Sequence, residues 1–148
     1  MRIPANLAYV VGALLLAAFA APALAAGKLV IEQGWIRLAP PGAMMLAGYA
    51  TLRNVGDEPL TVTGADSADF ASVSLHESIA EDGVERMRAL GHVSIAPGAS
   101  VEFAPGSKHF MLMRPVRELK LGETVKIHVS TGVSTGTTAE FVVRDPTP

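Results

Sequence analysis

Two histidines and two methionines dominate the chemistry available to this chain: His76, Met87, His109 and Met111, in the spacing H-x10-M-x21-H-x-M. Imidazole nitrogen is a borderline ligand that suits copper, and thioether sulfur is soft and favours Cu(I). The chain contains no cysteine, so no thiolate is available for the same task. These donor types predict a Cu(I) site, provided that the fold brings the four side chains together.

The first two donors lie on segments expected to form a hairpin around Asp82-Gly83. A loop of four residues, Ala80–Gly83, would place His76 directly opposite Met87. A loop of Asp82-Gly83 alone would place His76 opposite Ala89. Both registers keep His76 and Met87 on one face of the sheet, because strand side chains alternate with a period of two.

The last two donors lie on a segment with clear alternation, 108–113. His109 and Met111 share one face of this expected strand, whereas Phe110 and Leu112 share the other and are natural core residues. A similar split surrounds His76. We therefore expect both histidines to face away from the core, at the rim of a sandwich.

The other histidines and methionines have plainer interpretations. Met113 shares a face with His109 but lies further along the strand, so we interpret it as a neighbour of the site. Met44 and Met45 are either core residues or extra thioethers near the site, since methionine fills irregular gaps. His92 and His128 are interpreted as surface residues.

The pattern of the chain is that of an all-β domain. Short apolar-polar alternations rich in Val, Ile, Thr, Phe and Tyr are separated by Gly, Pro, Asp and Asn, which predicts a β-sandwich or barrel. No amphipathic helix of useful length is expected, and residues 66–71 are compatible with a single turn. Nine strands are predicted, at 29–37, 46–54, 60–65, 72–78, 84–90, 100–103, 108–113, 124–130 and 138–143.

The N-terminal segment has the pattern of a secretory signal. Arg2 precedes an apolar stretch, Leu7–Ala20, and Ala23–Ala25 is a small-residue cleavage site. We expect residues 1–25 to be the signal peptide and residues 26–148 to be one periplasmic domain, with no stable membrane insertion after cleavage. An uncleaved anchor is the alternative, but the stretch is shorter than the ~20 residues of a membrane span.

Composition excludes several classes of protein. The formal net charge of −2 becomes −3 once Arg2 leaves with the signal peptide, so no basic surface favours nucleic acid. The lack of cysteine excludes disulfides, a lipid-modified cysteine and the thiolate that a blue-copper electron carrier needs.

The sequence around the four donors resembles the periplasmic copper chaperone family, PCuAC, whose signature has the same intervals. The similarity covers nearly all of the chain after the signal peptide. The segments that match are Gly48–Asn54, Leu75-His76-Glu77, Asp82-Gly83-Val84, Met87-Arg88, Ile95–Gly98, His109–Met113 and Leu121–Val125.

This resemblance implies a cupredoxin-like Greek-key β-sandwich that binds Cu(I) through the two histidines and two methionines. It also implies delivery to the copper A centre of cytochrome c oxidase, with oxidase subunit II or another copper chaperone as acceptor. Some relatives carry a His- and Met-rich C-terminal extension that takes Cu(II); this sequence shows none before Pro148, so we expect the core Cu(I) site alone. Arg114-Pro115 departs from the family pattern, because a Gly-Leu type turn is expected there.

Three alternatives differ in function. A copper-sequestration or resistance protein would use the same ligands, and a β-sandwich interaction module would bind no metal. A copper oxidase could use an N-terminal histidine, but the expected mature start is Ala26 or Gly27. We expect a protein that is not an enzyme.

Overall fold

The computed structural model describes residues 27–132 and 134–146, so the predicted signal peptide lies outside the described residues. This part of the chain contains no helix, and hence none long and apolar enough to cross a membrane. Its ten strands are β1 Leu29–Arg37, β2 Met45–Asn54, β3 Leu60–Asp66, β4 Phe70–Glu81, β5 Val84–Ala89, β6 Val93–Ile95, β7 Ser100–Phe103, β8 Lys108–Pro115, β9 Thr124–Thr131 and β10 Ser134–Arg144.

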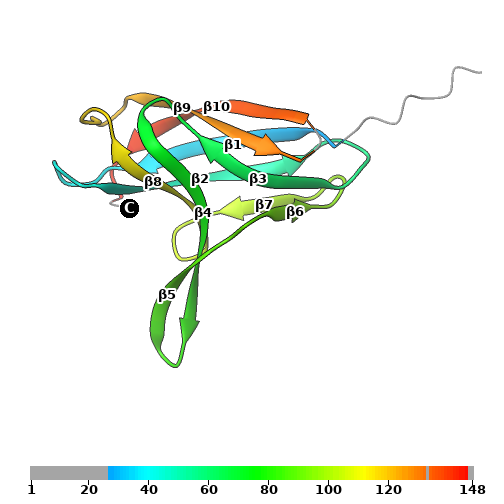
Figure 1. Cartoon of the computed structure of the whole chain (residues 1–148), viewed down its shortest axis with the longest axis horizontal. Helices are drawn as coiled ribbons and strands as arrows, with labels where there is room; N and C mark the ends of the chain where they lie inside the picture. The colour runs from blue at the N-terminus through cyan, green and yellow to red at the C-terminus, as the bar shows by residue number, and fades with distance from the viewer. Residues whose placement is uncertain (1–26, 133, 147–148) are drawn as a thin grey trace, which may run out of the picture.

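The strands close into a flattened barrel, which confirms the all-β sandwich expected from the sequence. Neighbouring strands run in the order β4-β8-β2-β1-β10-β9-β3, and a β3–β4 pairing closes the circle. Strand β5 extends the sheet beyond β4, and β6 extends it beyond β3. The far half of the β4–β5 hairpin therefore projects from the body of the sandwich (Figure 1).

One face of each strand fills the interior. Phe110 and Leu112 of β8 are fully buried, and so are Leu52 of β2 and Phe141 of β10. Phe110 contacts Phe141 edge-on, with ring centroids 5.7 Å apart. Because the side chains of β8 alternate, burial of Phe110 and Leu112 turns His109 and Met111 toward the opposite face.

The structure differs from the sequence predictions in two details. The single turn considered at 66–71 spans only Ser67–Phe70, where the Phe70 N–H donates to the Ser67 carbonyl at 3.4 Å, because β4 already begins at the buried Phe70. The strand β6, Val93–Ile95, was not predicted, because three residues are too few for alternation to be recognised. Val93 and Ile95 are buried and pair with β3 at Val62 and Leu60.

The hairpin that bears Met87 has the shorter of the two predicted loops. Asp82 and Gly83 have φ values of 52° and 76°, the positive values that a two-residue type I′ turn requires. Glu81 pairs with Val84, so the four-residue loop is wrong and Ala89 lies opposite His76. The two residues Asp82 and Gly83 thus set the register of the hairpin.

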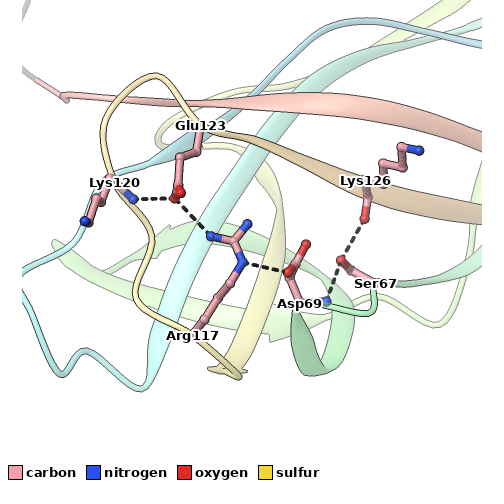
Figure 2. Close-up of polar contacts among 6 residues, drawn as sticks. All are labelled: Ser67, Asp69, Arg117, Lys120, Glu123 and Lys126. Carbon is pink, nitrogen blue, oxygen red and sulfur yellow. Dashed lines mark hydrogen bonds and ion pairs between the residues drawn. The ribbon is translucent and has the colours of Figure 1, made fainter.

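A polar network fixes the loop that follows β8 (Figure 2). The Arg117 side chain donates to Asp69 Oδ1 and to Glu123 Oε2, both at 3.0 Å, and the Lys120 backbone N–H donates to the same Glu123 oxygen at 2.7 Å. Ser67 Oγ donates to the Lys126 carbonyl at 2.7 Å. The turn between β3 and β4 is thereby tied to the segment between β8 and β9.

Asn54, at the end of β2, has no exposed surface and satisfies its whole side chain internally. Its Oδ1 accepts from the backbone N–H groups of Lys28 and Gly56, at 3.2 and 3.0 Å. Its Nδ2 donates to the carbonyls of Glu58 and Ile95, at 2.7 and 3.1 Å. One amide therefore joins the start of β1, the β2–β3 loop and β6.

We expect Asn54→Ala to lower the free energy of unfolding by about 3 kcal/mol, because it removes the partners of buried backbone groups. Urea unfolding of the apo protein measures the change. Arg53→Ala, at the neighbouring exposed position, is the control and should change stability by less than about 0.5 kcal/mol. Equal effects of the two variants would contradict a special role for the Asn54 amide.

Candidate metal centre

The two histidines of the motif lie on adjacent strands, directly across from each other. The antiparallel register of β4 and β8 pairs His76 with His109. Their rings stack with centroids 6.0 Å apart and planes inclined at 25°. His109 is buried, at 5 % exposure, although it faces away from the core, whereas His76 is half-buried. The prediction that both face away from the core is correct, but the rim position holds only for His76.

The two methionines share the face of the histidines. Met111 lies opposite Ser74, two residues before His76, and Met87 lies opposite Ser78, two residues after it. Residues directly opposite on an antiparallel pair point to the same side of the sheet, so all four donors share one face. Met111 is half-buried, and Met87 is 57 % exposed on the projecting hairpin.

A cavity of about 240 Å³ opens beside these donors. Met87, His109 and Met111 line one side of it, and Met45 lies in the same lining. The remaining wall comes from the end of β1, the start of β2 and the segment between them: Arg37, Leu38, Ala39, Pro40, Leu46 and Ala47. Three of the four predicted donors therefore reach one cavity, and the fourth, His76, stacks on His109.

Each imidazole has one nitrogen held by a hydrogen bond and one nitrogen without a partner. His109 Nδ1–H donates to the Ser107 carbonyl at 3.2 Å, because a carbonyl can only accept. His76 Nε2 lies 3.0 Å from Ser74 Oγ. Among the described residues, His76 Nδ1 and His109 Nε2 are the buried side-chain polar atoms that lack a hydrogen-bond partner. Since buried polar atoms are normally hydrogen-bonded, these two nitrogens are candidate metal ligands.

Burial and the neighbouring ring of His109 both favour the neutral form of His76. Burial lowers the pKa of His76 below its ordinary value of 6.5, and the neighbouring His109 ring lowers the pKa further by charge repulsion. A neutral imidazole has the free electron pair that a metal needs. The unfolded chain binds a proton on His76 near pH 6.5, and the folded chain binds it less readily. The folded state therefore loses stability as the pH falls below 6.5.

An ion-pair triad supports the donors from the other face of the sheet. Glu77, next to His76, accepts from Arg88 on β5 at 2.7 Å and from Lys108 on β8 at 3.2 Å. The hydrogen bond from Arg88, and then that from Lys108, lower the pKa of Glu77 below its ordinary value of 4.5. This carboxylate holds β5, β4 and β8 together, and its share of stability is present above pH 4.5 and lost as the pH falls through the lowered pKa.

Within the described ranges, no cluster of three or more His, Cys, Asp and Glu side chains is placed to hold a metal. The donors that this face offers to an ion are the thioethers and the two imidazoles. Such a neutral set of two nitrogens and two sulfurs suits a soft monovalent ion better than a hard divalent one. The residues present therefore fit the predicted Cu(I), while their role as ligands stays a prediction.

The structure also places the residues that had plainer interpretations. His92 is exposed. His128 is half-buried on β9, and its Nδ1 lies 3.0 Å from Thr138 Oγ1 on the neighbouring strand. Met45 is 46 % exposed, so of its two predicted roles the core role is wrong. No sequence pattern predicted the contacts of Ser74 and Ser107 with the two rings, because those contacts depend on tertiary geometry.

The fold and the donor set define a class of protein. The structure matches the solved "Copper-bound PCuAC domain from PmoF2" with a TM-score of 0.68 and 25 % identity, covering 81 % of this chain and 95 % of that one. It matches the "Solution structure of CuI-DR1885 from Deinococcus radiodurans" with a TM-score of 0.65 and 27 % identity, covering 84 % and 83 %. The sandwich is therefore cupredoxin-like and of the PCuAC type.

Sequence comparison then gives the family. Residues 29–143 match the family model described as "LpqE-like: Putative lipoprotein LpqE-like". The "Putative lipoprotein Lxx21020" of Leifsonia xyli subsp. xyli is 32 % identical over 123 residues, which span 82 % of this chain and 72 % of that protein. The chain belongs to the LpqE-like family of PCuAC-type domains.

We expect His76 in the metal-free protein to titrate below pH 6.5 in an NMR pH series of the imidazole signals. His109→Gln should raise the pKa of His76 only part of the way back, because burial is the larger cause of the shift. Titration of His76 above pH 6.5 would contradict this account of the pair.

Proposed function

We propose that this chain is a periplasmic metallochaperone that binds Cu(I) through His76, Met87, His109 and Met111. The observation that supports this most strongly is the pair of unpartnered nitrogens, His76 Nδ1 and His109 Nε2, on adjacent strands. Two thioethers flank these nitrogens on the same face of the sheet. Two of the solved structures that this chain resembles are the copper-bound PCuAC domain from PmoF2 and CuI-DR1885, which supports the choice of metal.

The chemistry of the site is that of a carrier and not of a catalyst. Neutral thioethers do not titrate, so they bind and release Cu(I) without moving a proton. The two imidazoles must be neutral to coordinate, which makes the affinity fall as the pH falls through the imidazole range. Oxidation to Cu(II) should weaken the complex, because thioether sulfur prefers the softer Cu(I).

The location and acceptor that we propose rest on the sequence. The N-terminal segment has the pattern of a secretory signal, which supports export to the periplasm. The resemblance to the periplasmic copper chaperones supports delivery to the copper A centre of cytochrome c oxidase, on its subunit II or through another copper chaperone. Sequestration of copper would use the same donors and is the alternative that a transfer experiment separates.

We expect Met111→Leu to weaken Cu(I) binding by at least about 100-fold, since loss of an outer-shell group alone costs 10–100-fold in metal affinity. Leucine keeps the volume of the side chain, so thermal stability should stay within a few degrees of the wild type. Competition with a chromophoric Cu(I) chelator under anaerobic conditions measures the affinity.

Met44→Leu is the matched control for that experiment. Met44 is 61 % exposed and precedes β2, outside the cavity that Met111 lines. Its replacement should leave the affinity unchanged. If Met111→Leu lost stability and kept its copper, the residue would be structural and the proposed site would be wrong.

Delivery is tested by mixing the Cu(I)-loaded protein anaerobically with an apo copper A domain of an oxidase subunit II. We expect the metal to move to that domain, because acceptor thiolates bind Cu(I) more strongly than thioethers and imidazoles do. Copper content of the two proteins after separation gives the result. Retention of copper on this chain would favour sequestration over delivery.

A further inference from the structure

The methionines of this chain gather around one site. Of six methionines in the sequence, four lie on strands of the donor face: Met45, Met87, Met111 and Met113. Two of them, Met87 and Met111, belong to the proposed Cu(I) site. The other two, Met45 and Met113, have no role in the function proposed above.

Met45 and Met113 lie directly opposite each other on β2 and β8, one alternation beyond Met111. They therefore share its face, and opposite residues in an antiparallel pair have Cβ atoms about 4.5–5.5 Å apart. Met45 also lines the cavity that Met111 lines. Ala47, which pairs with Met111, has a small side chain and lines the same cavity.

The backbone holds this group of thioethers in place. The Arg114 N–H donates to the Met44 carbonyl at 2.7 Å, which ties the start of β2 to the end of β8 beside the Met45–Met113 pair. Arg114 has a φ of 50°, a left-handed value that glycine adopts most easily. The resemblance led us to expect glycine at this position, and here arginine adopts the left-handed value.

Packing does not explain these methionines. The core lies on the other face of both strands, where Leu46 pairs with Leu112. Met45 is 46 % exposed and Met113 is half-buried, so neither residue belongs to the buried core. Arg37 lines the same cavity, and its positive charge disfavours a divalent cation more than a monovalent one.

We propose that Met45, Met111 and Met113 form a second station for a soft monovalent cation, made of thioethers alone and adjoining the two histidines. That the natural cargo is Cu(I) rests on the proposed function. An ion enters or leaves through the exposed Met45–Met113 pair. Bonds from the metal to the sulfurs of Met45 and Met113 break as bonds to His76 and His109 form, with no electron and no proton transferred.

The test uses Ag(I) as a stable probe in a His76→Ala/His109→Ala variant. We expect this variant to keep weak Ag(I) binding that does not change between about pH 5 and 7, because thioethers do not titrate. Adding Met45→Leu and Met113→Leu should weaken that binding by at least about tenfold, the lower limit for losing groups that support a metal site. Adding Met44→Leu instead should change nothing.

A second measurement covers the case in which the histidine variant does not fold. Methyl NMR of the wild-type methionines follows Ag(I) beyond the first equivalent, where the signals of Met45 and Met113 should move and that of Met44 should not. Two results would overturn the proposal of a second station. One is the absence of Ag(I) binding in the folded histidine variant, and the other is a response confined to Met87 and Met111 in the wild type.

Failure of the station is distinguishable from failure of the proposed function. If Cu(I) binding by the wild type did not depend on Met111 or the histidines, the proposed chaperone site would be wrong. If Cu(I) binding depended on them while Met45→Leu/Met113→Leu changed neither Ag(I) measurement, only the station would be wrong.

Discussion

The pairing of β4 with β8 is the constraint on which the site depends. In this register His76 lies opposite His109 and Leu75 lies opposite Phe110, so one choice buries the apolar residues and presents the imidazoles together. A slip by one residue would exchange the two faces of a strand and place a histidine in the core. Because burial of Phe110 and its neighbours enforces the register, the hydrophobic core determines the geometry of the polar site.

Much of this arrangement could be predicted from the sequence because alternation is a local signal. The split of Phe110 and Leu112 from His109 and Met111 follows from a period of two, and the fold confirms it. Gly83, after Asp82, was a sound sign of a tight turn, but residue types alone allowed two loop lengths. Only the positive φ of both residues, in the folded chain, selects the shorter loop.

Features that depend on contacts between distant segments could not be predicted. His109 was expected at the rim, yet it is buried, with its Nδ1–H held by the Ser107 carbonyl. The same carbonyl accepts from the Ser78 N–H at 3.1 Å, so one loop residue positions both β8 and the hairpin. Strand β6 is too short to show a period, and its burial depends on β3. These details are set by packing, for which a single sequence has no local pattern.

The four donors differ in how firmly the fold holds them, and this difference suits exchange of a metal. His76, His109 and Met111 lie on strands that are paired on both sides. Met87 lies on β5, an edge strand that pairs only with β4 among the described strands. All residues of β5 are exposed. Segments with few buried contacts open at the lowest free-energy cost. In the proposed site, the Met87 thioether would therefore be the donor that an incoming ligand displaces first, while the paired strands would keep His76, His109 and Met111 in position.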